Sequence, residues 1–234
     1  MKKYLVLLAI FFNTHSMADT VFGVEAGIQS WYYDNSGDIA SPFDPTISDG
    51  NFDIDNESAL TYFIALEHGV PLVPNFKLRH TKMDDQINCA ADVACLGDID
   101  INLSHTDITA YYELLDNWVN LDLGLSGIYF SGNSQIQSAI NIASEDYSEI
   151  IPALYGKAEF EFPTTDISAS LTANVGTLTD NSVVDLELAV KYKFTLGFGL
   201  EAGLRRQTVD FNDFDTVNVD STSTGVYAAL NFDF

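Results

Sequence analysis

The chain has 234 residues, 47% of them hydrophobic, and its 34 acidic and 10 basic residues give a net charge of −24. Nucleic acid is excluded as a partner, because binding to phosphates needs clusters of Lys and Arg that this sequence lacks. Wholesale disorder is also excluded, since disordered chains combine strong net charge with low hydrophobicity.

The first residues predict export. Lys2 and Lys3 precede an apolar run over 4–12, and small residues, Ser16 and Ala18, stand where a signal peptidase reads them. The run is shorter than the roughly 20 residues that a membrane-spanning helix needs.

We therefore predict that residues 1–18 are a signal peptide, cleaved between Ala18 and Asp19. Residues 19–234 then form one domain, which their number suits.

Alternation of apolar and polar residues with period two recurs from Val21 to the last residue and predicts β-strands. Most of the strands are longer than the about five or six residues usual in soluble sheets, and they match the roughly 9–11 that cross a bilayer in a tilted barrel. For 134–149 the sequence allows a short helix or a continuation of the preceding strand after a break near Gly132. The ten predicted strands are 20–33, 58–67, 76–83, 103–115, 119–130, 151–162, 167–178, 184–194, 197–208 and 222–234.

The connections between these strands take turns in length. Mostly long linkers lie at 34–57, 84–102, 131–150, 179–183 and 209–221, and short ones lie between them. Outer-membrane barrels have this arrangement, with tight periplasmic turns, longer external loops and an even number of strands.

The two cysteines, Cys89 and Cys95, are separated by five residues in the polar stretch 84–100. An oxidising compartment favours a disulfide between them. Metal binding is the weaker interpretation, because no second pair at zinc spacing completes a tetrahedral site.

The polar face of the strands decides between a membrane barrel and a soluble barrel or sandwich. It mixes glycines and small residues with charges of both signs, which suits a narrow lumen. The apolar face carries aromatics near the strand ends, which predicts the two girdles at the membrane interfaces. We assign to these girdles Trp31, Tyr32, Tyr33, Phe76, Tyr112, Trp118, Tyr129, Phe160, Phe162, Tyr192, Phe194, Phe232 and Phe234.

The whole domain resembles Gram-negative outer-membrane β-barrels. The alternating segment from Gly225 to Phe234, with Phe232 and the terminal Phe234, is similar to the carboxy-terminal signal that the barrel-assembly machinery reads in that class. The turn over 66–75 is similar to the first short turn of a family of small outer-membrane proteins from marine gammaproteobacteria, and this resemblance implies no particular activity.

Most charges on the strands share the inward parity, which avoids the cost of about 2–4 kcal/mol for a Lys or Arg facing lipid at mid-membrane. We predict that they form ion pairs that fill the lumen; a conducting or ligand-binding lumen is the alternative. Registers of the hairpin over 184–208 place Asp185 or Glu187 opposite Arg205, and one of them places Lys191 opposite Glu201. The predicted lumen network comprises Glu25, Lys77, Arg79, Glu113, Lys157, Glu159, Asp185, Glu187, Lys191, Glu201 and Arg205.

Lys82 and Arg206 take the apolar parity at the external ends of their strands. There they would contact lipopolysaccharide phosphates, or extend to the interface as long basic side chains ordinarily do.

The acidic residues crowd the five long linkers. Residues 49–55 space oxygen ligands like the start of a calcium loop, but Ile54 and Leu60 stand where a calcium loop needs Gly and Glu, so we reject an EF-hand. A solvated acidic surface is the main interpretation, and weak divalent-ion binding that bridges the loops to lipopolysaccharide is the alternative.

Enzymes among barrels of this membrane use Asp and His, or Ser and His. Candidates here are Asp84, Asp85, His105 and Asp107, of which His105 and Asp107 share the inward parity. The sequence offers no second Asp and His pair and no Ser and His dyad at a recognisable spacing, so we do not predict an enzyme.

The prediction is thus an all-β protein, an antiparallel transmembrane up-and-down β-barrel of about ten strands, with eight or twelve as alternatives. It is expected in the outer membrane as a monomer without a cofactor, in contact with membrane lipids and lipopolysaccharide. A structural or surface-interaction role is favoured, and a small cation-preferring channel is the rival.

Overall fold

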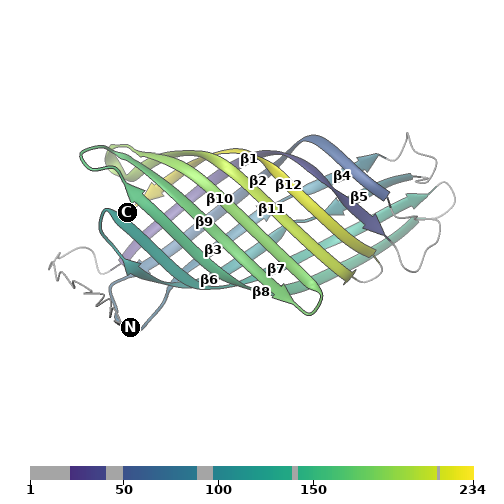
Figure 1. Ribbon diagram of the computed structural model, residues 1–234, viewed down its shortest axis with the longest axis horizontal. Coiled ribbons are helices and arrows are strands. Elements are labelled where there is room, and N and C mark those ends of the chain that lie inside the picture. Colours follow the sequence, from purple (N-terminus) through teal and green to yellow (C-terminus); the bar gives the residue numbers. More distant parts are fainter. Residues whose placement is uncertain (1–21, 41–49, 89–96, 139–141, 215–216) are drawn as a thin grey trace, which may run out of the picture.

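The computed structural model describes residues 22–40, 50–88, 97–138, 142–214 and 217–234. These residues form a barrel of long, tilted strands, with the first and last described residues, Phe22 and Phe234, at the same mouth (Figure 1). We call this mouth the terminus end and the opposite one the loop end. The predicted cleavage site at Ala18 and Asp19 and the predicted disulfide between Cys89 and Cys95 lie outside the described residues.

The strands are the main elements, and a single 3-10 turn, η1 (Thr195–Gly197), joins two of them. The described strands are β1 (Phe22–Ala40), β2 (Gly50–His68), β3 (Asn75–Lys82), β4 (Asp84–Asn88), β5 (Gly97–Asn102), β6 (His105–Leu115), β7 (Val119–Ser138), β8 (Ile142–Glu161), β9 (Ile167–Leu178), β10 (Asn181–Lys193), β11 (Phe198–Phe214) and β12 (Val217–Asp233).

Ten strands close the ring in the described part of the chain. The order runs β7-β6-β3-β2-β1-β12-β11-β10-β9-β8, all antiparallel, and β8 pairs again with β7. β4 and β5 continue β3 and β6 beyond short breaks. At the seam, Val24 and Phe234 exchange both backbone hydrogen bonds, at 2.8 and 3.0 Å. The predicted up-and-down barrel of ten strands is confirmed.

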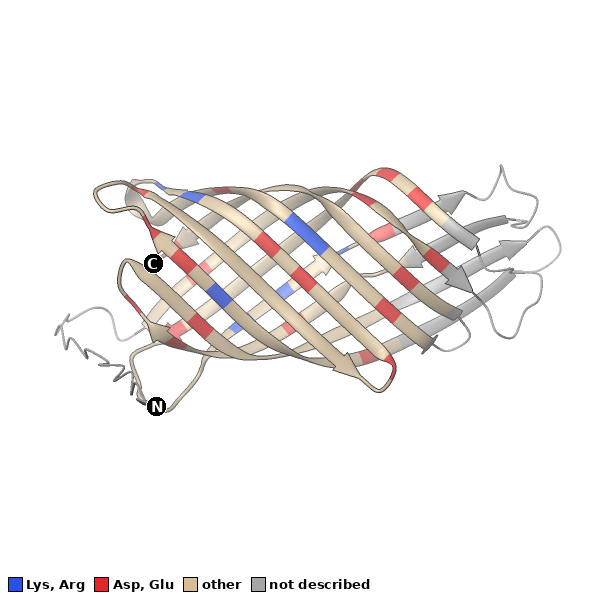
Figure 2. Ribbon diagram, viewed as in Figure 1, with Lys and Arg blue, Asp and Glu red and all other residues tan. Residues whose placement is uncertain are grey.

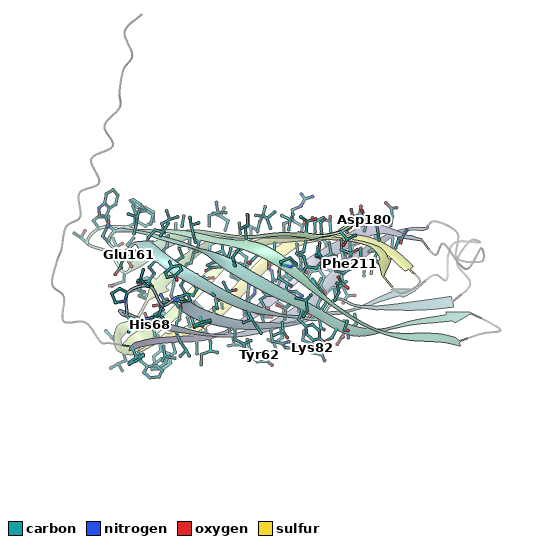
Figure 3. All side chains as sticks on the ribbon, turned by 90° about the horizontal axis from the view of Figure 1, so that it is seen from below. Tyr62, His68, Lys82, Glu161, Asp180 and Phe211 are labelled. Carbon is teal, nitrogen blue, oxygen red and sulfur yellow. The ribbon has the colours of Figure 1, made fainter. Side chains whose placement is uncertain are left out.

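Every second side chain of the ring points outward and forms an apolar belt. Leu188 is 54% exposed, Leu125 65% and Leu230 60%, in a barrel whose inward residues are mostly buried. Figure 3 shows these side chains projecting from the outer surface of the wall. Among the described residues no helix is long and apolar enough to cross a bilayer, a finding that concerns helices only.

The strands are longer than predicted, and this corrects four of the predicted linkers. β1 and β2 pair as far as Ile39 and Gly50, and β7 and β8 pair as far as Gln137 and Ile142. The segment 134–149 is therefore strand on both sides of 139–141, not helix, and the chain does not break at Gly132.

Toward the loop end, the apolar side chains of the long strands point inward and the polar side chains point outward. On β11 the inward residues Arg205 and Gln207 are followed by inward Val209 and Phe211, which are 1% exposed, while the outward row changes from Leu204 to polar residues. The polar outward face and apolar interior are those of a water-soluble barrel. The belt ends where this exchange occurs.

The extended walls are two four-stranded sheets, β2-β1-β12-β11 and β4-β5-β7-β8. In the described residues, β2 pairs with the β3–β4 strand only up to Leu60 opposite Lys82, and β8 pairs with β9 only up to Ala153 opposite Gly176. The two sheets diverge at the right of Figure 1.

Acidic residues are concentrated on these extensions (Figure 2), many of them on strands and not in loops as predicted. Asp38, Asp220 and Asp210 stand side by side on β1, β12 and β11. Partial burial, followed by the charges of Asp210 and Asp38, raises the pKa of the Asp220 carboxyl above its usual range. These three carboxylates repel one another at neutral pH, as directly opposed like charges do.

A glycine allows β12 to approach β1 beside the lumen. A Cβ atom on Gly225 would lie 1.8 Å from the Tyr32 carbonyl oxygen and 2.5 Å from the Tyr33 Cα. These are backbone atoms, so the strands must separate to accept a methyl group.

We expect Gly225→Ala to destabilise the folded barrel by about 1–3 kcal/mol, the usual cost of overpacking. The readout is the denaturant midpoint of the folded, heat-modifiable gel band. Gly127→Ala is the control, because a Cβ there meets only Ile150 Cγ2, at 3.9 Å. Equal midpoints for the two variants would contradict the close approach.

Candidate functional site in the barrel lumen

The lumen is divided into three layers of inward side chains. The mouth layer lies at the terminus end and contains Glu25, Lys157, Glu159, Lys191, Glu201 and Tyr227. The charge layer lies in the middle and contains Arg79, Asp107, Asp185, Glu187 and Arg205. The apolar layer lies toward the loop end, and its members are Trp31, Tyr33, Phe52, Met83, Leu103, Ile128, Phe130, Ile151, Val183, Val209, Phe211 and Val219.

The charge layer joins opposite walls of the barrel through two arginines. Arg79 on β3 donates from Nε to Asp107 Oδ2 at 2.8 Å, from Nη1 to Glu187 Oε1 at 2.6 Å, and from Nη2 to Asp185. Arg205 donates from Nε and Nη2 to Asp185, at 3.0 and 2.9 Å. Asp185 thus binds both guanidinium groups, and the layer is a single connected network.

The register of β10 and β11 brings Arg205 to Asp185 and Glu187. Glu187 stands opposite Arg205, and Lys191 stands opposite Glu201, which is one of the two predicted registers. The ion pairs of Asp185 and Glu187 with Arg79 cross the lumen instead, because β3 and β10 are not neighbours in the ring.

Trp31 covers the charge layer on the side of the loop end. Its ring lies 4.5 Å from the Arg205 Cζ atom, and the side chain is 0% exposed. A guanidinium over an indole face is an attractive cation–π contact, stronger where water is excluded. The assignment of Trp31 and Tyr33 to an interfacial girdle is wrong: both share the inward parity of Glu25 and Gln29.

The mouth layer is also paired. Lys191 donates to Glu25 at 2.6 Å, and Lys157 donates to Glu159 at 2.8 Å. The carboxylate of Glu201 accepts the Tyr227 hydroxyl at 2.7 Å.

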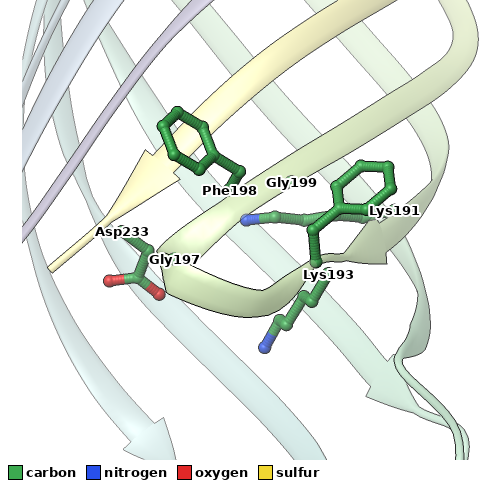
Figure 4. A pocket seen from close by; sticks show the side chains of 7 residues that line it. Lys191, Lys193, Gly197, Phe198, Gly199 and Asp233 are labelled. Carbon is green, nitrogen blue, oxygen red and sulfur yellow. The ribbon is translucent and has the colours of Figure 1, made fainter.

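An open recess lies beside this layer, at the hairpin between β10 and β11 (Figure 4). Lys191 and Lys193 line it together with Asp233. Lys193 is itself paired with Glu161, at 2.8 Å, so neither lysine offers an unpaired charge to a ligand.

Three predicted members of the network form no ion pair among the described residues. One is Glu201, which accepts hydrogen bonds from Tyr227 and Asn231, while Lys191 pairs with Glu25 instead. The Lys77 Nζ atom lies 4.9 Å from the centre of the Phe63 ring. Glu113 lies opposite another carboxylate, Asp122, and takes part in none of the ion pairs among the described residues. Asp107, which the sequence suggests only as an enzyme candidate, also belongs to the network. Its inward parity, opposite Arg79 on the neighbouring strand, is the signal that identifies it.

The apolar layer is buried and closely packed. Phe130 meets Phe211 edge to face with ring centres 5.1 Å apart, and Trp31 lies 4.5 Å from Tyr33. Phe130, Ile151, Met83 and Val183 are 0% exposed. Side chains from walls on opposite sides therefore fill the lumen at this level.

His105 lies between the charge layer and the apolar layer. Its Nδ1–H donates to the Leu103 carbonyl at 2.9 Å, and its Nε2 lies 3.2 Å from Gln207 Nε2. The ring packs on Phe130 and is 2% exposed. Asp107 is bound by Arg79, so the candidate base and acid are both engaged within the wall.

The remaining predicted site residues lie on the outer surface. Lys82 and Arg206 are exposed on the outward face, and Lys82 pairs with Asp84 at 3.3 Å. Phe232 and Phe234 are outward on the closing strand, with ring centres 5.4 Å apart. Among the described residues no group of three or more His, Cys, Asp or Glu is arranged to hold a metal ion.

The comparisons with known proteins find likeness in fold only. No family model matches the sequence, and no curated protein matches it significantly. The outer membrane protease OmpT of Escherichia coli matches with a TM-score of 0.56 and 10% identity, over 91% of this chain and 97% of that chain. Two further matches are weaker: the translocator domain of the autotransporter NalP of Neisseria meningitidis (TM-score 0.48, 10% identity, 94% and 90% of the two chains) and Ail of Yersinia pestis (0.38, 11%, 88% and 97%).

The match to OmpT agrees with the topology described above: the chain has the fold of outer-membrane β-barrel proteins. The likeness to solved structures is one of fold and does not extend to activity.

Neighbouring arginines on opposite faces allow a controlled test of the charge layer. Arg205→Met leaves the buried Asp185 and Glu187 with Arg79 as their one arginine among the described residues, and removing one partner of a buried pair costs roughly 3–5 kcal/mol. Arg206→Met changes an exposed side chain and should alter stability by less than about 0.5 kcal/mol. Reversible urea unfolding in lipid vesicles measures both, and similar losses would contradict the network.

Proposed function

We propose that this protein is a non-conducting outer-membrane β-barrel of a Gram-negative bacterium, with a structural or surface-interaction role. The observation that carries the proposal is the lumen, in which a paired charge layer and a buried apolar layer stand in series. The protein then acts through its surfaces: the apolar belt toward lipid and the acidic extensions toward the outside of the cell.

The belt supports a membrane location. A row of exposed Leu, Val, Phe and Tyr side chains around a closed ring is favourable in lipid and unfavourable in water. The tight turns at the terminus end suit the periplasm, and the extended walls suit the exterior. The similarity of the carboxy-terminal segment and of the turn over 66–75 to barrels of this class agrees with that orientation.

The apolar layer opposes conduction for a simple reason. A hydrated ion entering it would have to leave its water, and the surrounding Phe, Val, Ile and Met side chains provide no replacement ligands. Below it, Asp185 and Glu187 are occupied by arginines. An ion would have to displace both sets of contacts in turn.

Planar-bilayer recording tests this proposal. We expect no steady conductance from the purified barrel at concentrations at which a general porin of 16 strands, the control, conducts. The rival function, a small channel for cations, would produce steady cation-selective currents, because the acidic rim raises the local cation concentration. Folding of the same sample is verified by its heat-modifiable gel band.

The proposal includes no hydrolase. OmpT is a protease, but an enzyme of that kind needs an accessible base, and His105 is enclosed by Leu103, Gln207 and Phe130. Asp107, its neighbour on the inward face, is held by Arg79.

Lipopolysaccharide is the proposed partner of the outer surface. Lys82 and Arg206 extend outward where the belt ends, at the level expected for lipid phosphates; the side chain of Lys82 is 67% exposed. Each basic group near an anionic surface contributes about 1 kcal/mol to the attraction.

We expect Lys82→Ala combined with Arg206→Ala to lower the amount of lipopolysaccharide that copurifies with the barrel, by severalfold at low salt. Lys193→Ala, which removes a basic group at the opposite end, is the matched control. Equal lipopolysaccharide in both variants would remove Lys82 and Arg206 as contacts.

A further inference from the structure

Two turns at the terminus end present a leucine that has almost no contact with the protein. Leu72, in the turn between β2 and β3, is 92% exposed, and Leu196, in the turn between β10 and β11, is 86% exposed. Full burial of a Leu side chain gains roughly 1.5–3 kcal/mol relative to water. Packing within the barrel does not explain a leucine at either place.

The backbone does not explain these leucines either. Leu72 has φ 68° and Leu196 has φ 71°, both in the left-handed region, which glycine and asparagine adopt more readily. A third turn, between β8 and β9, has the same conformation at Thr164, with φ 66°. A turn position with positive φ therefore accommodates a polar residue here, and leucine at the other two positions needs another reason.

The turn between β2 and β3 is hydrogen-bonded to the outer face of the barrel. The hydroxyl of Tyr112, an outward residue of the belt, donates to the Leu72 carbonyl oxygen at 3.1 Å. His68 holds the base of the same turn, with its Nε2 3.2 Å from the Pro74 carbonyl oxygen. The turn is thus fixed beside the belt.

The second turn continues the belt directly. Leu196 lies between Phe194 and Phe198, which are 50% and 54% exposed and whose row continues into Tyr192 and Leu200. The recess at this hairpin is lined by Lys191, Lys193 and Asp233 together with Phe194 and Phe198 (Figure 4). The apolar row thus reaches the edge of the mouth.

We propose that the turns over 69–74 and 194–197 are anchors that insert Leu72 and Leu196 into the periplasmic leaflet of the membrane. The proposal rests on the proposed membrane location and adds a specific lipid contact to it. A periplasmic protein is the other occupant considered, but continuity of both turns with the belt favours lipid.

The consequence is an uneven rim at the periplasmic mouth. The two leucine turns lie on either side of the β1–β12 seam in the ring order. The turn after β8 carries Thr164, and the turn after β6 carries Trp118, which is 59% exposed. The seam side therefore penetrates the leaflet more deeply than the turn between β8 and β9.

Spin labels at single cysteines measure this depth in vesicles of phosphatidylethanolamine and phosphatidylglycerol. Leu72→Cys, Leu196→Cys, Thr164→Cys and Leu188→Cys are made in a chain in which Cys89 and Cys95 are serine. Oxygen, which concentrates in lipid, and a water-soluble nickel chelate are the two relaxing agents. We expect labels at 72 and 196 to collide mainly with oxygen and the label at 164 to collide mainly with nickel.

The label at 188 separates the two proposals, because Leu188 lies within the belt. If label 188 prefers nickel, the membrane location itself fails. If label 188 prefers oxygen while labels 72 and 196 respond to nickel as label 164 does, the anchors fail and the membrane location stands.

A thermodynamic measurement complements the labels. Leu72→Asn and Leu196→Asn keep a residue that tolerates positive φ, and each should lower the equilibrium constant for folding into these vesicles about tenfold through lost apolar burial. Thr164→Asn is the matched control and should leave it unchanged. Unchanged constants for all three variants would overturn the anchors.

Discussion

In a closed ring of strands, each side chain points either to the outside or into the lumen. Ten strands enclose a space that side chains themselves can fill. Every inward residue therefore needs a partner from another wall, and every inward charge needs an opposite charge or a hydrogen bond, because burying it alone is very costly. The network of Arg79, Asp185 and Arg205 follows from this constraint.

The same constraint decides how much of the fold the sequence predicts. Period-two alternation specifies which residues share a face, so strand number, inward charges and the register that sets Lys191 opposite Glu201 could be derived. Contacts across the lumen could not. Arg79 and Asp185 are 106 positions apart, and their meeting depends on the tilt and stagger of all ten strands.

One physical reason explains why the alternation predicts strands that are too short and places Trp31 on the outer face. Where the barrel leaves the membrane its outer solvent changes from lipid to water, so the apolar face changes from outward to inward while the strand continues. On β1, outward Ile28 and Tyr32 give way to Asp34, and inward Gln29 gives way to Trp31. A prediction that assumes the same apolar face along the whole strand therefore ends the strand where the apolar residues change sides.

Local irregularities add a second limit. β1 and β2 shift register beyond Tyr33, where Asn56 has φ 64° and its N–H donates to Asp34 Oδ1 at 3.0 Å. The shift turns Phe52 and Ile54 inward, although residues of odd number point inward on the rest of β2. A bulge of one residue reverses the faces of everything beyond it, and alternation alone does not reveal where it stands.

The two closed layers of the lumen strengthen each other because they differ in chemistry. The apolar layer excludes water from the loop end, which lowers the local dielectric and strengthens the attraction between Arg205 and Asp185. In return, the Arg205 guanidinium holds the face of Trp31, at 4.5 Å, and thereby fixes the base of the apolar layer. Hydration of one layer would weaken the other, so the interior is expected to open as a unit or not at all. This mutual support agrees with the closed barrel that we propose, in which recognition falls to the belt, the turns and the acidic walls.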